Sequence, residues 1–352
     1  MSMALLDKEF ETDKPYISVI ITAYKRKEFI LGAVNSVINQ SLEKSKYEII
    51  VVKNYLDNTI DKFLNEHNII DIYTDRIPLG AKIAYGIEKS EGEVICFLED
   101  DDLFLPNKLE IIYSVFKENP NITFLRNEVI KTRSMNLEND VILKGKIGEC
   151  LITFSVYQLI KLKNVNDLIV KFEANVNISS MSIRKNKYLQ YEYLIEKTEF
   201  LQDTLIFVIS LFDYNDNISF FNEPLSIWRI HRSASNTGEN PSIDEILNKH
   251  LQNAEYSYNS INIVIEYLKE NQSLKIEKSV AVYLNIAKGA YMAGIKLIKG
   301  QRPTVCEIKS LFKTGYYHKD ISIISSSLLG FISIISPNIS RKIFIYALRL
   351  YN

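Results

Sequence analysis

Four consecutive acidic residues, Glu99-Asp100-Asp101-Asp102, are the part of the sequence best suited to chemistry. Adjacent carboxylates repel one another, so folding alone gains little from bringing them together. They follow the apolar run Val94 to Leu98, at the end of a predicted buried strand. Mg²⁺ and Mn²⁺ prefer oxygen ligands, and protein-bound Mg²⁺ typically completes its shell with phosphate oxygens and water. The cluster therefore predicts a divalent cation with a nucleotide diphosphate; the alternative is a solvated acidic turn in which Asp102 caps the next helix.

The elements around this cluster alternate between strands and helices. Nearly continuous apolar runs predict buried strands at residues 17–21, 47–52, 69–74 and 94–98. Helical spacing of apolar residues predicts helices at residues 27–41, 61–68 and 80–90. This rhythm indicates an α/β fold with a doubly wound, mostly parallel sheet and helices on both faces. Ligands bind beyond the carboxyl ends of such strands, which are residues 22–26, 53–58 and 99–102.

The remainder of the chain is less regular and then becomes helical. Residues 105–235 mix predicted strands and helices, and residues 243–315 are predominantly helical. The clearest shift in composition lies at Asn236 to Pro241. We therefore expect a polar leader at residues 1–15, a catalytic domain at 16–236 and a helical C-terminal region at 237–352.

The overall composition excludes several classes of protein. The chain has 352 residues, with 42 Lys and Arg against 43 Asp and Glu, and this near-neutral balance argues against a nucleic-acid partner. Hydrophobic residues make up 47% and charged residues 24%, which is ordinary globular usage. Cys96, Cys150 and Cys306 are too scattered for a disulfide framework or a zinc cluster. The charged first residues contain no long apolar run, so we expect a cytoplasmic protein without a secretory signal.

Several segments resemble the motifs of glycosyltransferase family 2, in the order in which that family carries them. FLEDDDLFLPNKLE resembles its metal-binding strand end, roughly FLDADD-x-x-x-P-x-x-L. SVIITAYKR is similar to the opening SVIIPTYNR, EIIVV to the second strand and NSVINQS to the S-V-L-x-Q-T helix. FLQDTLIF resembles the motif with the acidic catalytic base, and EPLSIWRIHRSASN resembles L-x-x-Y-R-x-H-x-x-S-x-S. Each match alone is weak, but the series over residues 16–236 is specific. It implies a GT-A fold and an inverting, hexosyltransferase-type transfer from a nucleotide-sugar.

The resemblance assigns roles to the acidic cluster. By register Asp101 is the metal ligand, and a one-residue slip makes Asp102 the ligand instead. Glu99 stands where the family usually has Asp, and Asp100 is expected to contact the ribose. The implied cofactor is Mg²⁺ or Mn²⁺, with the nucleotide-sugar as co-substrate.

The resemblance also places a base and two donor-binding side chains. Asp203 is the expected general base, although Gln202 replaces the usual Glu before it; the alternative for Asp203 is a helix N-cap. Arg229 is expected to hold the diphosphate, and His231 to touch the metal. For both, the alternative is a buried structural strand.

The remaining donor-side candidates follow the first three strands. Thr22, Ala23, Tyr24 and Arg26 occupy the loop that holds the nucleobase in the family. Tyr24 is expected to pack on the base and Arg26 to approach it; the alternative for Tyr24 is ordinary core packing. Lys53-Asn54 replaces the usual Asp pair, which leaves the donor base open, although Asn54 can hydrogen-bond a pyrimidine. Lys82 is expected to face the nucleotide; the alternative is a solvent-facing side chain.

The last part of the chain, residues 321–351, combines apolar and basic segments. Ile321 to Ser336 is shorter than the roughly 20 residues of a spanning helix. Arg341, Lys342 and Arg349 follow among apolar residues, which suits attachment to a membrane surface. The alternatives are a helical hairpin packed on the catalytic domain and a dimer contact. The membrane interpretation predicts a peripheral protein at the cytoplasmic face, with a lipid-linked or glycan acceptor.

Two other functions stay open at this point. A sugar nucleotidyltransferase also combines this kind of sheet with a metal-bound nucleotide, but would be expected to carry a Gly-rich phosphate loop. TAYKRKEF contains no glycine, which counts against it. A non-catalytic nucleotide-sugar binder is favoured by the departures at Glu99, Gln202 and Lys53. The acceptor pocket is expected within residues 125–200.

Overall fold

The computed structural model describes residues 14–24, 26–76, 78–133, 147–161, 165–213, 215–231, 242–271, 278–317 and 321–351. The predicted domain boundary at residues 236–241 and most of the predicted leader lie outside the described residues. So does the second half of the EPLSIWRIHRSASN motif, after His231.

The first half of the sheet is parallel, as predicted. β1 (Ile17–Ala23), β2 (Tyr47–Lys53), β3 (Ile70–Tyr73) and β4 (Val94–Glu99) are arranged in the order β3-β2-β1-β4. Every residue of β1 is buried, which explains its nearly continuous apolar sequence. The connecting helices are α1 (Lys27–Ile38), α2 (Asn58–Glu66) and α3 (Leu79–Lys89). The second helix begins three residues earlier than predicted because the Asp57 carboxylate accepts hydrogen bonds from the backbone N–H groups of Thr59 and Ile60.

The second half of the sheet is mixed. β8 (Met181–Arg184) runs antiparallel between β4 and β6 (Ile122–Thr132), and β9 (Asn217–Arg229) runs parallel to β6. β5 (Leu103–Phe104) and β7 (Leu151–Ser155) pair antiparallel with β9. Because β8 runs opposite to β4, the chain entering β8 lies beside the end of β4, where the acidic cluster stands.

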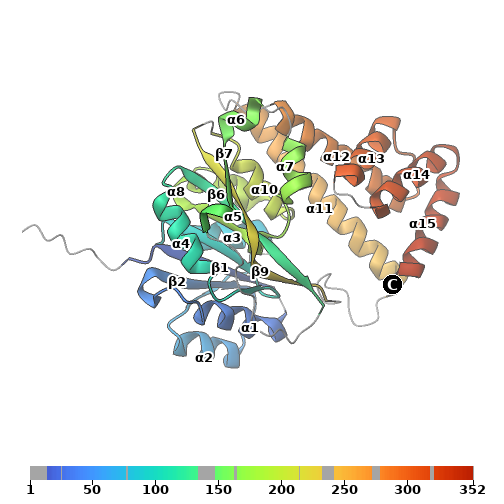
Figure 1. Ribbon diagram of the computed structural model, residues 1–352. Helices are drawn as coiled ribbons and strands as arrows, with labels where there is room; N and C mark the ends of the chain where they lie inside the picture. The colour runs from blue at the N-terminus through green and yellow to red at the C-terminus, as the bar shows by residue number, and fades with distance from the viewer. Residues whose placement is uncertain are drawn as a thin grey trace, which may run out of the picture.

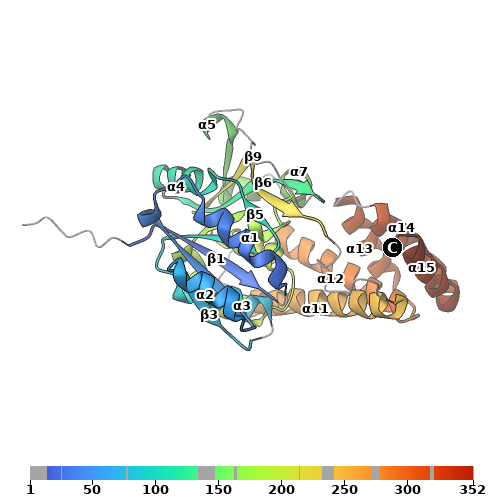
Figure 2. The ribbon, with the colours of Figure 1, turned by 90° about the horizontal axis from the view of Figure 1, so that it is seen from below.

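Helices cover both faces of the sheet, which confirms the predicted doubly wound architecture (Figures 1 and 2). α1, α2 and α4 (Lys108–Glu118) share one hydrophobic core with the sheet. α3, α8 (Lys185–Leu189), α9 (Glu192–Lys197) and α10 (Gln202–Ile209) share the other. The shorter elements are η1 (Lys44–Lys46), α5 (Ile147–Cys150), α6 (Val156–Lys161), α7 (Val165–Phe172) and η2 (Ile178–Ser180).

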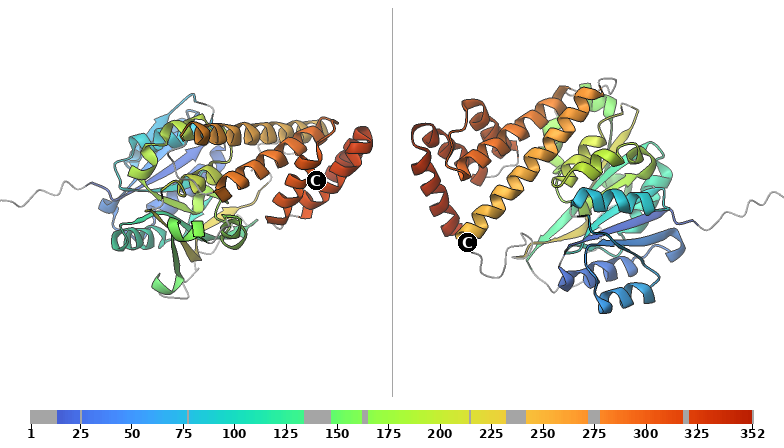
Figure 3. Two further views of the ribbon diagram at one scale, coloured as in Figure 1. Left: turned by 90° about the horizontal axis from the view of Figure 1, so that it is seen from above. Right: turned by 180° about the vertical axis from the view of Figure 1, so that it is seen from behind.

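The C-terminal region is helical, as predicted. It consists of α11 (Ile243–Glu270), α12 (Lys278–Ile298), α13 (Val305–Tyr317), α14 (Ile321–Ile335) and α15 (Pro337–Tyr351). α11 and α12 bury apolar side chains in the same core as α10, among them Ile261, Val264 and Leu284. α14 packs on α13, and α15 packs on α14, α12 and α11, so this hairpin belongs to the helical region. Figure 3 shows α14 and α15 at the end of the region that lies far from the sheet.

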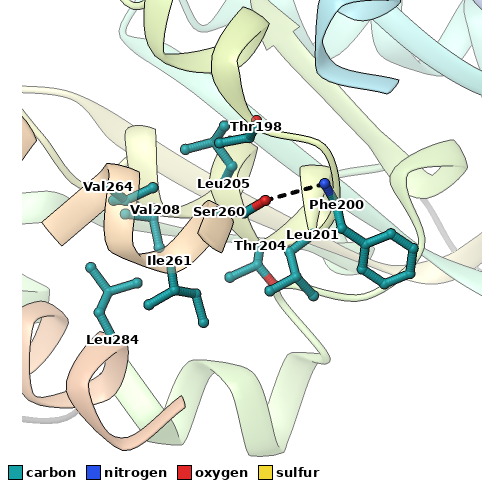
Figure 4. A pocket seen from close by; sticks show the side chains of 10 residues that line it. All are labelled: Thr198, Phe200, Leu201, Thr204, Leu205, Val208, Ser260, Ile261, Val264 and Leu284. Carbon is teal, nitrogen blue, oxygen red and sulfur yellow. Dashed lines mark hydrogen bonds between the residues drawn. The ribbon is translucent and has the colours of Figure 1, made fainter. Parts of the chain in front are cut away.

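Apolar side chains line the junction between the two parts. Figure 4 shows Leu201, Leu205 and Val208 of the α10 segment meeting Ile261 and Val264 of α11. At its edge the backbone N–H of Phe200 donates a hydrogen bond of 3.2 Å to the Ser260 hydroxyl. This apolar seam joins α11 to the part of the chain that forms the sheet.

Two helical glycines should respond oppositely to the same substitution. A Cβ at Gly80 would lie 2.0 Å from the carbonyl oxygen of Ile195 and 2.4 Å from that of Thr198. Gly80→Ala should therefore force α3 away from α9 and lower the free energy of unfolding by about 1–3 kcal/mol. A Cβ at Gly294 in α12 meets nothing within 4 Å, so Gly294→Ala should raise it by about 0.5–1 kcal/mol. Urea denaturation measures both, and equal effects would contradict the packing of α3 on α9.

Candidate active site

The acidic cluster divides into two parts at the end of β4. Glu99, Asp101 and Asp102 each offer a carboxylate oxygen, and these oxygens lie within 4.8 Å of one another. Asp100 turns instead toward the end of β1, where it accepts a hydrogen bond of 3.0 Å from the backbone N–H of Tyr24 and pairs with Arg26 at 2.5 Å. The cluster is therefore built into the fold and is not a solvated turn, since Asp100, Asp101 and Asp102 are all buried.

Burial shifts the protonation of these carboxyl groups. It raises the pKa of Asp100 to about 7, against the lowering effect of the Arg26 charge. Burial, reinforced by the charge of Asp101, raises the pKa of Asp102 to about 6. The pKa of Glu99 is raised well above its usual value by burial and by the neighbouring Asp101 and Asp102. A cation bound beside these carboxyl groups would favour their ionised form and lower these pKa values again.

Arg26 and Lys82 supply positive charge on the β1 side. The Arg26 guanidinium pairs with both Asp100 and Asp101. Lys82 is 1% exposed, so the solvent-facing alternative is wrong. It lies on the buried face of α3. Its Nζ lies 4.5 Å from the centre of the Tyr24 ring, and burial lowers its pKa to about 8.

The end of β9 brings Arg229 and His231 to the other side of the cluster. The backbone N–H of Arg229 donates to Asp102 at 3.1 Å, and its Nε donates to the carbonyl oxygen of Asp101. The His231 Nε2 lies 3.1 Å from the Asp101 carboxylate, and its ring packs on Phe29 of α1 with centroids 4.3 Å apart. Arg229 is the last residue of β9, as expected if it belongs to a buried structural strand. Arg229 and His231 nevertheless both contact the acids.

Asp203 lies in the first turn of α10. Its carboxylate accepts hydrogen bonds from the backbone N–H groups of Thr204 at 2.7 Å and of Asn177 at 3.2 Å. Burial raises its pKa to about 6, despite these hydrogen bonds. The N-cap alternative is wrong: Leu201 holds that position with φ of 63°, because the helix begins at Gln202.

Asn177 connects Asp203 to the acidic cluster. Its backbone N–H reaches Asp203, and its side-chain amide donates to the Asp102 carboxylate at 2.8 Å. Its φ of 61° is in the left-handed region, which Asn tolerates better than most residues. The sequence reasoning missed Asn177, because no motif marks it and its two partners are 75 and 26 residues away along the chain.

Ser179 and Lys108 stabilise the cluster through hydrogen bonds to its backbone and to each other. The sequence analysis did not identify either residue. The Ser179 hydroxyl accepts a hydrogen bond of 3.0 Å from the backbone N–H of Glu99. The fully buried Lys108 donates to the Ser179 carbonyl oxygen at 2.7 Å and to the Ser226 hydroxyl at 2.9 Å. Burial lowers the pKa of Lys108 to about 7. Only Lys108 could have been found from the sequence, because it lies in the PNKLE segment of the motif that follows the acids.

Thr22 and Ala23 lie in β1 and not in the predicted loop. The strand extends to Ala23 because Thr22 pairs with Glu99 and Ala23 with Lys53 in the neighbouring strands. The loop therefore begins at Tyr24. Thr22 still touches the site, since its carbonyl oxygen accepts a hydrogen bond from the backbone N–H of Asp100.

Asn54 follows the end of β2, and Lys53 does not reach the acidic cluster. The buried Lys53 ammonium pairs with Asp61, at 3.2 Å, and with Asp71. The half-buried Asn54 has an amide oxygen with no hydrogen-bond partner in the described part of the chain. Asn54 is therefore the member of this pair that can still bind a ligand.

The donor set fits a divalent cation. Glu99, Asp101 and Asp102 provide oxygen ligands, which Mg²⁺ and Mn²⁺ prefer. His231 borders this set through its Nε2, which lies 3.1 Å from the Asp101 carboxylate. Arg26 and Arg229 are the cations that already contact these acids.

Comparison with known proteins agrees with this geometry. Residues 18–189 match the family model described as Glycosyl transferase family 2. The chain is 23% identical over 253 residues to an uncharacterized glycosyltransferase of Haemophilus influenzae, covering 69% of this chain and 80% of that protein. It is 21% identical over 170 residues to the poly(ribitol-phosphate) beta-N-acetylglucosaminyltransferase TarP of Staphylococcus aureus, covering 45% of this chain and about half, 52%, of that protein.

A solved structure shares the fold. The mannosyltransferase PcManGT from Pyrobaculum calidifontis, in complex with GDP-Man and Mn²⁺, superimposes with a TM-score of 0.50 at 10% sequence identity. The match covers 93% of this chain and 87% of that chain, so it includes the C-terminal helices as well as the sheet.

Removal of Arg26 should leave two buried carboxylates without their paired cation. In EDTA at pH 8, Arg26→Gln should lower the free energy of unfolding by about 3 kcal/mol, because Asp100 and Asp101 lose their cation. A carboxyl group whose pKa is raised by folding stabilises the fold below its ordinary pKa and loses that contribution as pH rises through the raised value, here about 7. The loss should therefore be smaller at pH 5, where Asp100 is protonated.

Arg76→Gln is the matched control for this measurement. Arg76 pairs with Glu196 at 2.8 Å on the surface, so its loss should cost less than about 1 kcal/mol at both pH values. Urea denaturation at pH 5 and pH 8 compares the two variants. An equal loss for Arg26→Gln at the two pH values would contradict the assigned role of the acids.

Proposed function

The chain belongs to glycosyltransferase family 2 and is a glycosyltransferase that uses a nucleotide-sugar donor, and from this premise we propose a metal-dependent, inverting transfer with Asp203 as the general base. The observation that carries the proposal is the link through Asn177 between Asp203 and the acidic cluster. Membership of this family also argues against the two alternative functions, a sugar nucleotidyltransferase and a non-catalytic nucleotide-sugar binder.

The proposed reaction is a single displacement at the anomeric carbon. The oxygen of an acceptor hydroxyl forms a bond to that carbon while the bond from the carbon to the diphosphate oxygen breaks. The electron pair leaves with the nucleoside diphosphate, and the hydroxyl proton passes to the Asp203 carboxylate. A pKa of about 6 keeps Asp203 ionised at pH 7 and still basic enough to accept this proton.

On the donor side we assign roles by position around the cluster. Glu99, Asp101, Asp102 and His231 are proposed to hold the divalent cation. Bound there, Mg²⁺ or Mn²⁺ supplies positive charge for the departing diphosphate. Arg26, Lys82 and Arg229 are proposed to hold the diphosphate. Asp100 is proposed to hold the ribose, and Tyr24 and Asn54 the base.

For the acceptor we propose a lipid-linked or surface glycan precursor, reached by membrane contact through α14 and α15. No helix in the described part of the chain is both long and apolar enough to cross a bilayer. Large apolar side chains are exposed along this hairpin: Leu328, Phe331, Ile332, Ile335, Ile339, Ile343 and Tyr346. Arg341 and Lys342 are exposed among them, which adds attraction to anionic lipids.

Two substitutions separate chemistry from donor binding. Asp203→Asn should reduce kcat for transfer by about 10²–10⁴-fold, because the hydroxyl proton loses its acceptor, and should leave the Kd for UDP with Mn²⁺ within twofold. Asp101→Ala should also abolish transfer, but by weakening UDP binding in the presence of Mn²⁺. Calorimetry and a donor panel with Mn²⁺ or Mg²⁺ measure the two quantities.

The pH profile provides a second check, on Asp203 together with Asp102, whose pKa is also about 6. With a pKa of about 6, kcat/KM for the unmodified protein should fall below pH 6. Unchanged turnover in Asp203→Asn would remove this residue as the base.

Membrane contact can be tested by co-sedimentation with vesicles. Phe331→Asp and Ile335→Asp should reduce binding to phosphatidylglycerol-containing vesicles several-fold, since both replace exposed apolar surface with charge. Val282→Asp is the matched control, because Val282 is 52% exposed on α12, away from the hairpin. If the hairpin variants bind the vesicles as well as the control does, the membrane proposal fails.

A further inference from the structure

A cavity of about 150 Å³ lies beside Asp203, between the start of α10 and the C-terminal helices. Its lining includes Asn175, Leu201 and Asp203 from the catalytic domain and Tyr283, Ala287 and Tyr291 from α12. By the same measure one water needs about 10–15 Å³, so the space is large enough for a substantial ligand group. The three α12 residues are spaced four apart, so one face of that helix forms the wall.

The polar groups of the cavity include an acceptor that the protein leaves unused. The Asn175 amide donates to the Tyr283 hydroxyl at 2.9 Å and to the Thr204 hydroxyl at 3.2 Å. These bonds fix the orientation of the amide, yet its buried Oδ1 has no partner among the described residues. Unsatisfied buried oxygens are uncommon and call for a donor, such as a ligand hydroxyl.

The tyrosines supply aromatic surface together with hydroxyl donors. Burial raises the pKa of Tyr291 to about 12 and raises that of Tyr283 as well, so both stay protonated at neutral pH. Tyrosine combines a large apolar face with a polar tip, which matches the alternating C–H and hydroxyl surface of a sugar ring. Leu201 and Ala287 complete a largely apolar wall with a few polar groups, the usual make-up of a small-molecule site.

The charge of the cavity selects against an anionic ligand. Asp203 is a carboxylate, and none of the described residues that line the cavity is Lys, Arg or His. A phosphate group there would meet a negative charge without a compensating cation. A neutral, hydroxyl-rich group fits this environment.

On the α11 side the cavity borders a second pocket. This much smaller, apolar pocket shares Leu201, Thr204 and Ile261 with it (Figure 4). Its other side chains, such as Leu205 and Val264, pack the α10–α11 seam. This seam holds α11 and α12 in place, so the position of Tyr283 and Tyr291 relative to Asp203 is set by the fold.

We propose that this cavity binds one neutral sugar or polyol unit of the acceptor, with Asn175, Tyr283 and Tyr291 as specificity-determining residues and the reactive hydroxyl at Asp203. The inference rests on the proposed function, because it uses Asp203 as the base. It assigns the C-terminal helices a direct part in acceptor recognition. The earlier expectation of an acceptor pocket within residues 125–200 covers only Asn175 and Val176 of the lining.

The test measures binding directly, so that it does not depend on turnover. The full chain, with UDP and Mn²⁺, is titrated with methyl β-D-glucopyranoside, methyl β-D-galactopyranoside and glucose 6-phosphate, followed by saturation-transfer NMR. Ala287→Leu should fill the cavity and raise the apparent Kd of the neutral glycosides at least tenfold. Tyr291→Phe, which keeps the volume, should raise it about three- to tenfold. The Kd for UDP should stay within twofold in both variants.

Tyr267→Phe is the matched control, since Tyr267 lies on α11 and packs against Tyr191, outside the cavity. It should leave glycoside binding unchanged, and thermal unfolding verifies that all three variants fold. The proposal is overturned if neither neutral glycoside binds, if glucose 6-phosphate binds best, or if Ala287→Leu and Tyr291→Phe bind the glycosides like the control. Absence of UDP binding in the unmodified protein would instead overturn the proposed function. The glycoside titrations would then still show whether the cavity binds a neutral sugar.

Discussion

The accumulation of carboxylates at the end of β4 is the constraint on which the rest of the site depends. Ionised groups are costly to bury unless they are paired or hydrogen-bonded. Three of the four acids are accordingly paired by other parts of the chain: Asp100 by the β1 loop, Asp101 by Arg26 and His231, and Asp102 by Asn177 and Arg229. The same contacts that make the cluster tolerable also bring the ends of β1, β4, β8 and β9 together.

The parallel half of the sheet and the cluster itself could be predicted from the sequence, because both depend on patterns among neighbouring residues. Buried strands such as Ile17–Ala23 are continuous apolar runs, and the acids stand directly after one of them. The antiparallel insertion of β8 could not be predicted in this way. A four-residue strand, Met181–Arg184, carries too little periodicity to reveal its neighbour or its direction.

For the site, the ionisable residues were predictable and their supports were not. Arg26, Arg229 and His231 lie in recognisable motifs, and the structure brings all three to the acids. The side chains of Asn177 and Lys108 act through hydrogen bonds to Asp102 and Ser179, 75 and 71 residues away, which no spacing rule contains. Thr22 and Ala23 were misplaced because the strand pairs that extend β1 depend on the lengths of β2 and β4.

The backbone around Asp203 shows how firmly the fold holds this carboxylate. Asn177 and Leu201 both have positive φ, at 61° and 63°, a conformation that costs non-glycine residues on the order of 1–3 kcal/mol. Asn177 uses it to aim its N–H at Asp203, and Leu201 uses it to begin the helix that carries Asp203. Such strain persists only where surrounding packing overrides it, and here that packing includes Ile261 of α11 and Leu284 of α12. The C-terminal helices therefore contribute to the position of Asp203, because their apolar side chains pack against Leu201, one of the two strained residues.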